Sequence, residues 1–247
     1  MATKTSIANA SACWSCGAGQ ESPAHFCVAC GKVQPGHTVD HFTFFGLPRK
    51  LTLDVAALER EFYRLSRKLH PDVYARASER EQQWSLERSS QLNDAYRTLK
   101  DPVSRTAYLL GLEGVQLEEQ SKAATDRARL TGEEKKQVVP PDMLEEAFEL
   151  NLQLEDLRME KKTGATDPGV IAELNAARAR FEQRLEALGD ELRGYWKEWD
   201  ALPFHNHPGA ASGDAGRIRV RDKMVDLLNR RSYIRNLVRD VTEELSH

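Results

Sequence analysis

The chain contains 247 residues, of which 40% are hydrophobic and 30% are charged, and this predicts two small domains with tails rather than one large core. A formal net charge of −3 and a pI of about 6.2 argue against a general nucleic-acid-binding or membrane-surface protein. No apolar run approaches the ~20 residues that a membrane-spanning helix needs. The first twelve residues hold one lysine, no arginine and no apolar signal core, so we expect a cytoplasmic protein.

All four cysteines lie within the first thirty residues, in two Cys-x-x-Cys pairs separated by ten residues: Cys13, Cys16, Cys27 and Cys30. Gly17 and Gly31 follow the two pairs and permit the positive-φ turn of a zinc knuckle, which aims backbone N–H groups at the thiolates. We predict one zinc ion on these four residues, because a segment this small needs a metal to hold a fold. Two disulfides or a redox pair are the alternatives. We expect His25 in a loop rather than as a ligand.

Residues 41–48 predict a short aromatic-rich helix, and a longer helix follows from a cap at Thr52 or Asp54 to residue 69. Its apolar side chains form one narrow stripe at helical spacing: Leu58, Phe62, Leu65 and Leu69. Its cations fall on the opposite face and are nearly unmixed with acids: Arg60, Arg64, Arg67 and Lys68. A basic face is usually just solvated. This one runs straight into the next loop, which favours docking on an acidic partner.

That loop carries the tripeptide His70-Pro71-Asp72. Proline disfavours helical geometry at the residue before it and ends the arriving helix. We therefore expect a short polar loop that displays an imidazole and a carboxylate to solvent.

A second helix is expected to run to about Lys100, with one side suited to a close antiparallel contact: Trp84, Leu92, Ala95, Tyr96 and Leu99. Asp101 and Pro102 then predict the cap and first residue of a short helix, and Gly111 is expected to end it.

In chain order, the segments HFTFFGL, the basic helix, LHPD and QLNDAYRTLKDPVSRTAYLLGLEG resemble the J-domain of the HscB family, the co-chaperones of iron–sulfur cluster assembly. The resemblance covers roughly residues 40–115, and the run NDAYRTLKDPxxRxxYLL points to HscB rather than to general DnaJ proteins. Eukaryote-type members also resemble this chain in carrying a paired CxxC module before the J-domain. The resemblance implies that a DnaK-type or HscA-type ATPase docks on the basic helix and the loop.

The resemblance also implies roles for single residues. Asp72 is needed for ATP hydrolysis by the partner, and His70 and Pro71 fix the loop geometry. The docking role falls to three cations of the basic helix: Arg64, Arg67 and Lys68.

Beyond a polar hinge region at 113–141, three helical stretches are expected: from about 142 to 162, from a cap and proline at 167–168 onward, and from about 218 to 245. A Gly/Pro/Ala-rich loop joins the last two. It holds His205 and His207, which we interpret as ordinary loop residues because no acid or thiol pair accompanies them.

The helix at 142–162 carries two apolar stripes. One suits the core of a three-helix bundle: Met143, Ala147, Leu150, Leu154 and Leu157. The other lies about 145° around the axis and comprises Leu144, Phe148, Leu152 and Met159. In a bundle of three helices, a second stripe beside Glu145 and Glu149 predicts a partner site, and the alternative is that both stripes are buried.

HscB relatives bind the cluster scaffold protein IscU through a motif that resembles LEEAFELNLQL here. The resemblance therefore assigns scaffold binding to Leu144, Phe148, Glu149 and Leu152. The chain departs from the family at Asp226, where relatives tend to hold an aromatic residue that supports the same surface.

The expected fold is all-α, with a zinc-ribbon-like module (1–38), a J-domain (39–115), a linker (116–140) and a three-helix scaffold-binding domain (141–247). The sequence shows no nucleophile–base pair, phosphate loop or carboxylate dyad, so we predict a co-chaperone that couples scaffold binding to ATP hydrolysis by its partner, and not an enzyme. It is expected in the cytoplasm, or in the mitochondrial matrix if the source is eukaryotic. The alternatives are a J-domain protein with another client and a zinc-dependent structural or regulatory protein with a vestigial J-domain.

Overall fold

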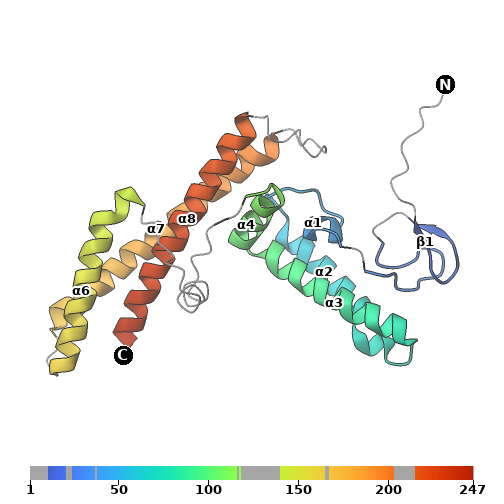
Figure 1. Cartoon of the computed structure of the whole chain (residues 1–247), viewed down its shortest axis with the longest axis horizontal. Helices are drawn as coiled ribbons and strands as arrows, with labels where there is room; N and C mark the ends of the chain where they lie inside the picture. The colour runs from blue at the N-terminus through green and yellow to red at the C-terminus, as the bar shows by residue number, and fades with distance from the viewer. Residues whose placement is uncertain are drawn as a thin grey trace, which may run out of the picture. The chain divides into compact units, whose positions relative to one another are not determined.

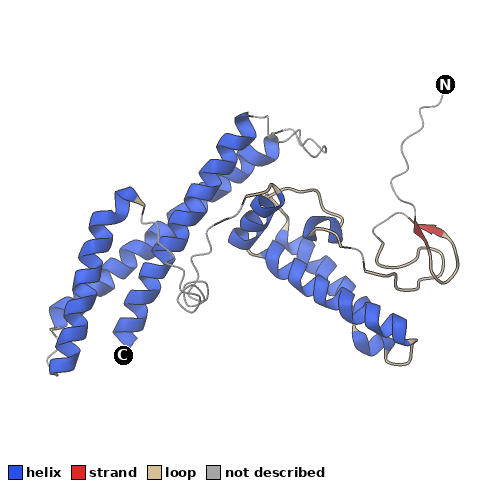
Figure 2. Ribbon diagram, viewed as in Figure 1, coloured by secondary structure: helices blue, strands red, loops and turns tan. Residues whose placement is uncertain are grey.

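The computed structural model describes residues 11–20, 24–36, 38–115, 117, 140–164, 167–202 and 215–246. The chain divides into two compact units, Met1–Leu109 and Leu110–His247. Helices dominate the described part and the only sheet there has two short strands (Figures 1 and 2), so the predicted all-α fold is confirmed. Nearly all of the predicted linker and the loop with His205 and His207 lie outside the described residues.

The first unit begins with two antiparallel strands, β1 (Ser11–Ala12) and β2 (Gly19–Gln20), and a bridge between Phe26 and Val33. The strand pair encloses the turn of Cys13 and Cys16, and the bridge encloses the turn of Cys27 and Cys30. Gly17 and Gly31 have φ angles of 71° and 74°, as the knuckle geometry predicts. The two knuckles are therefore built alike.

Among the described residues, three helices follow in this unit: α1 (His41–Phe44), α2 (Val55–Leu69) and α3 (Glu79–Lys100), with a 3-10 turn, η1 (Pro71–Tyr74), between α2 and α3. A further helix, α4 (Pro102–Leu112), begins in this unit and runs three residues past its end. The Asp54 side chain accepts a hydrogen bond from the Ala57 N–H and begins α2. The leucine stripe of α2 is buried against α3, where Leu92, Ala95 and Leu99 are buried too, and Phe62 stacks on Tyr96 at 4.1 Å between ring centroids. Trp84, which the sequence places on the same side of α3, is only half-buried and packs on Trp14 of the cysteine module. This helix pair carries the loop at 70–78 between its ends.

The prediction that Gly111 ends α4 is wrong. The helix continues to Leu112, and the residue with positive φ is Gly114, at 82°. The Val115 N–H donates to the Leu110 carbonyl at 3.0 Å and the Gly114 N–H donates to the Gly111 carbonyl at 3.1 Å. This is a Schellman closure, in which the glycine that matters lies after the last helical turn and not within it.

The second unit contains a 3-10 turn, η2 (Pro141–Met143), and the helices α6 (Leu144–Thr163), α7 (Pro168–Ala201) and α8 (Ala215–Ser246). α7 and α8 lie side by side along much of their length (Figure 1). α6 packs against the first half of α7 and the second half of α8, where one core collects the first apolar stripe of α6 with Leu174, Phe181, Ile234 and Val241. No helix in the described residues is long and apolar enough to cross a membrane.

Two neighbouring leucines of α6 test this packing. Leu154 is 3% exposed in the core, whereas Leu152 is 46% exposed on the opposite side. Leu154→Ala should destabilise the second unit by about 2–5 kcal/mol because it leaves a cavity. Leu152→Ala should change its stability by no more than about 0.5 kcal/mol. Hydrogen exchange of α7 and α8 in increasing urea reports on this unit alone, and equal losses for the two variants would contradict the packing.

Candidate functional site

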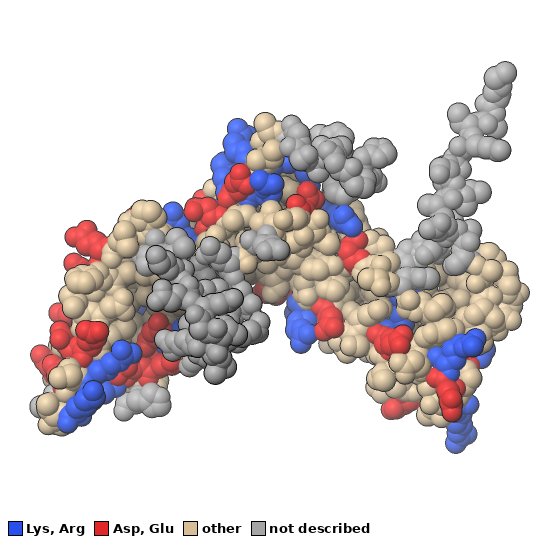
Figure 3. Space-filling view, in the orientation of Figure 1, with Lys and Arg blue, Asp and Glu red and all other residues tan. Residues whose placement is uncertain are grey.

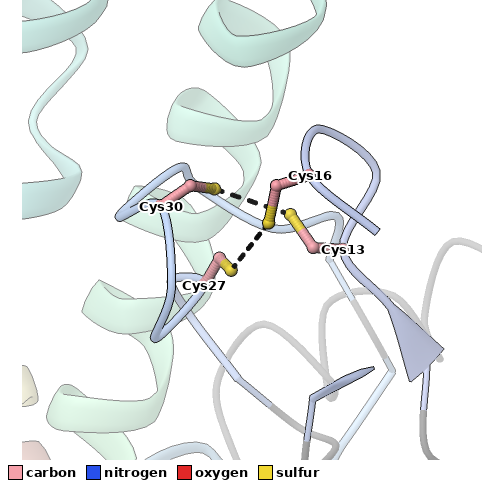
Figure 4. Close-up of side chains that lie close together, drawn as sticks. All are labelled: Cys13, Cys16, Cys27 and Cys30. Atoms are coloured by element: carbon pink, nitrogen blue, oxygen red, sulfur yellow. Dashed lines mark hydrogen bonds between the residues drawn. The ribbon is translucent and has the colours of Figure 1, made fainter. Parts of the chain in front are cut away.

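The four cysteines converge on one point between the two knuckles (Figure 4). Their sulfurs all lie within 4.8 Å of one another, and the pairs Cys13–Cys30 and Cys16–Cys27 are each 3.7 Å apart. A disulfide needs sulfurs about 2.05 Å apart. Four thiolates about 2.3 Å from one ion lie roughly 3.8 Å from each other. The cluster therefore fits a tetrahedral metal ion and not two disulfides.

The neighbouring thiols of the cluster shift one another's pKa values in opposite directions, so that one is deprotonated more easily than the other. Burial alone would raise the pKa of Cys13, but the backbone N–H groups of Cys16 and Ser15 and the neighbouring thiols lower it to about 6. The backbone N–H of Ala18 lowers the pKa of Cys16, yet hydrogen bonding to Cys30 and burial raise it to about 12. A metal cation held by Cys13, Cys16, Cys27 and Cys30 would favour the deprotonated form of all four thiols, because thiolates are its ligands.

His25 does not join the cluster. Its Nε2 lies 2.9 Å from the Phe44 carbonyl oxygen and its ring lies 4.5 Å from the Phe44 ring. Burial lowers the pKa of His25, so the neutral ring is favoured. Its loop placement, as expected from the sequence, joins the cysteine module to α1.

The His-Pro-Asp loop is exposed at the end of α2. His70 has an extended ψ of 130°, as expected before a proline, and its Nδ1 accepts a hydrogen bond from the Asp72 N–H at 3.3 Å. The Asp72 carboxylate is 90% exposed and lies 3.5 Å from the His70 ring. The loop therefore presents a free carboxylate on a backbone that its own histidine and Pro71 restrain.

The basic face of α2 is exposed but is less uniform than the sequence predicts. Arg64 donates two hydrogen bonds to the Glu61 carboxylate, at 2.7 and 2.5 Å, and these lower the pKa of Glu61. The i,i+3 spacing of the two residues was the available signal for this pair. Lys68 lies 5.8 Å from the Phe26 ring of the cysteine module. Arg67 is exposed, and neither it nor Lys68 forms an ion pair with a carboxylate among the described residues.

The second stripe of α6 is exposed to solvent. Leu144 is 55% exposed, Phe148 is 65% and Leu152 is 46%, and Met159 continues the stripe. The arrangement in which both stripes are buried is therefore wrong. Figure 3 shows acidic side chains along the outer side of α6 and basic ones near its C-terminal end. Glu149, beside the stripe, forms no ion pair with any residue that the structure describes.

The apolar core holds α6 in place, and partly exposed ion pairs to both neighbouring helices flank it: Arg184–Glu146 at 2.5 Å, Arg158–Glu244 at 2.8 Å and Arg230–Asp142 at 2.5 Å. Asp226, the position where the chain departs from the family, is exposed and lies 3.7 Å from Arg230. It thus belongs to a charge network that ties α8 to the start of α6. The exposed stripe is presented on a fixed helix.

The first unit matches known J-domains. A model for the DnaJ domain matches residues 40–108, which hold the basic helix and the His-Pro-Asp loop. In sequence, the chain is 35% identical over 156 residues to the co-chaperone protein HscB homolog of Bordetella petrii, covering 63% of this chain and 82% of that protein. The homolog from Vibrio parahaemolyticus is 31% identical over 163 residues, covering 65% and 84%.

Two solved structures have similar folds over most of the chain. Human co-chaperone protein HscB matches with a TM-score of 0.62 at 21% identity, covering 94% of this chain and 98% of that one. Chaperone HscB from Vibrio cholerae matches with a TM-score of 0.52 at 25% identity, covering 84% and 99%. At these identities, the human protein supports the fold and not the role of any single residue.

The cysteine cluster leads to a direct test. Purified under reducing conditions, the chain should carry one metal ion, and replacing Cys13 and Cys16 by Ser should abolish it, because two thiolates cannot complete a tetrahedral site. Elemental analysis of the dialysed protein measures the ion. A metal-free protein with two disulfides would contradict the site.

Proposed function

This chain belongs to the HscB family of co-chaperones, and from that premise we propose that it is an adaptor in iron–sulfur cluster assembly. One surface binds an IscU-type scaffold protein, and the other stimulates ATP hydrolysis by a DnaK-type or HscA-type chaperone. The observation that carries this proposal is the exposed apolar stripe of α6 in a chain whose other unit exposes a His-Pro-Asp loop. Binding at one surface and activation at the other couple client capture to cluster transfer.

The chaperone-facing surface combines attraction with positioning. Arg67 and Lys68, with the partly neutralised Arg64, favour an acidic partner and raise the rate of encounter. Asp72 then meets the partner as a carboxylate that is solvated before binding, so a cationic or N–H-rich site on the partner can hold it. The restrained loop lowers the entropy lost on docking.

The scaffold-facing surface fits a partner with an apolar patch and a basic rim. Phe148 is the most exposed member of the stripe and the best candidate for an anchor, because aromatic side chains dominate interface energetics. Leu144 and Leu152 flank it by one helical turn on either side. Glu149 adds an unpaired carboxylate for a cation of the scaffold.

We propose that the ion on the four cysteines is zinc. Four thiolates in a closed tetrahedron are typical of structural zinc, with no open position for catalysis. The curated relatives are co-chaperones, and we propose that this chain likewise acts by binding, with no reaction of its own. A cytoplasmic location stays a prediction. Iron instead of zinc in the purified protein would contradict the metal assignment.

Asp72→Asn tests the first surface. The substitution should reduce stimulation of a DnaK-type ATPase at least about tenfold, since a charge-assisted contact at an interface is worth roughly 1.5–3 kcal/mol. It should leave the melting curve unchanged, because the side chain is exposed and its carboxylate fixes no fold contact beyond the loop. The matched control is Asp94→Asn, another exposed carboxylate of the same unit. Full stimulation by Asp72→Asn would refute the role of the loop.

The exposed stripe of α6 is tested by replacing Leu144, Phe148 and Leu152 together by Ala. Binding to an IscU-type scaffold should weaken by at least about thirtyfold, since loss of one anchor removes ~2 kcal/mol. The second unit should remain folded. Ile171→Ala removes an exposed apolar side chain of α7 and serves as the control. Isothermal titration calorimetry measures the affinity, and a folded triple variant that binds normally would place the client elsewhere.

A further inference from the structure

The cysteine module is docked on one face of α3. The ring of Trp14 packs edge-on against that of Trp84, with centroids 5.3 Å apart, and the Arg80 guanidinium lies 5.9 and 5.8 Å from the two rings. Further along, the fully buried Arg88 donates hydrogen bonds to the Pro35 carbonyl at 2.8 Å and to the Ala24 carbonyl at 3.2 Å. Two carbonyls on either side of the second knuckle thus converge on one guanidinium of α3.

At the start of α3, a buried carboxylate joins the module to the helix. Glu81 is 5% exposed, and its Oε1 accepts a hydrogen bond from Lys32 Nζ at 2.7 Å. Lys32 comes directly after Gly31 of the second knuckle. Among the described residues, Lys32 is the cation that pairs with this carboxylate. A buried charge that loses its partner is costly, so the pair fixes the module and the helix end against each other.

The same carboxylate ends the His-Pro-Asp loop. Glu81 Oε2 accepts hydrogen bonds from the Ser78 hydroxyl at 2.9 Å and from the Ser78 N–H at 3.4 Å, which forms the capping box of α3. In the next residue, the Gln82 side chain donates to the Ala77 carbonyl at 3.0 Å. The segment that leads from Asp72 into α3 is therefore fastened to the residue that Lys32 holds.

We propose that Lys32 is a positioning residue for the His-Pro-Asp loop, through which the metal-bound module holds the C-terminal side of that loop in the geometry that activates the chaperone. The inference rests on the proposed function for its consequence in ATP hydrolysis. Its structural part needs only the first unit. The cysteine module then contributes to the geometry of the chaperone-facing surface and does not only stabilise its own segment.

The first test follows hydrogen exchange by mass spectrometry in the full-length, metal-loaded chain. In Lys32→Met, amides of residues 72–82 should exchange about tenfold faster, because Glu81 and the capping box that it forms with Ser78 are no longer tied to the cysteine module, while α2 is untouched. Lys32→Arg should restore wild-type exchange, since it renews the ion pair. Lys50→Met removes an exposed cation of the same unit and should change nothing.

The second test follows ATP hydrolysis against the concentration of the chain. Lys32→Met should lower the maximal stimulation severalfold and leave the half-saturating concentration within about twofold, because the basic face of α2 still docks. A chain that does not stimulate the ATPase at all would refute the proposed function, whereas hydrogen exchange would still decide the role of Lys32.

Elemental analysis must show that the metal is retained in these variants. If Lys32→Met loses it, Glu81→Gln decides alone, because this change removes the ion pair from the α3 side and leaves the knuckles intact. Faster exchange confined to 72–82 supports the proposal. Unchanged exchange there, or an equal rise across the whole first unit, would overturn it.

Discussion

Both candidate docking surfaces depend on one constraint, namely that a helix packed in a small helical unit buries only one of its faces. α2 buries its leucine stripe against α3, and its cations are left on the opposite side, next to the loop that carries Asp72. α6 buries Leu150 and Leu154 in the core of the second unit, so the stripe centred on Phe148 is left in water. The apolar core keeps α6 fixed, so its exposed side is presented without a rearrangement of the fold.

Much of this arrangement could be predicted from local patterns. Helical periodicity identified both stripes of α6, and Pro71 marked the end of α2, because caps and prolines act within one turn of the chain. Of the two candidate caps at its start, Thr52 and Asp54, the structure selects Asp54. The two Cys-x-x-Cys pairs and the glycines after them predicted the cluster from the sequence. In the structure these glycines adopt the required positive φ angles and the four cysteines lie together. The end of α4 was misplaced because Gly111 and Gly114 can both end a helix, and only the closing hydrogen bonds of the folded chain show that Gly114 does so.

The contacts between the cysteine module and α3 could not be predicted in the same way. Glu81 and Arg88 lie at helical spacing on the same face of α3 as Leu92, but their charge favours solvent exposure, and yet both are buried. Their partners, Lys32 and the Pro35 carbonyl, are some fifty residues away in the sequence, so no local pattern predicts these contacts. The two Cys-x-x-Cys pairs predict a metal for the module, but they indicate no contact between the module and the loop. The docked module therefore connects the cysteine cluster, through Lys32 and Glu81, to the end of the segment that carries the His-Pro-Asp loop.

An adaptor must carry both surfaces on one chain, and mixing two variants that each lack one surface shows whether this chain does. The Asp72→Asn chain and the chain with Leu144, Phe148 and Leu152 replaced by Ala are combined, and scaffold-dependent stimulation of the DnaK-type ATPase is measured. An adaptor must hold the scaffold and activate the chaperone at the same time. We therefore expect the mixture to stay as inactive as either variant alone. Recovery of wild-type stimulation in the mixture would show that the two surfaces act independently and would contradict the account.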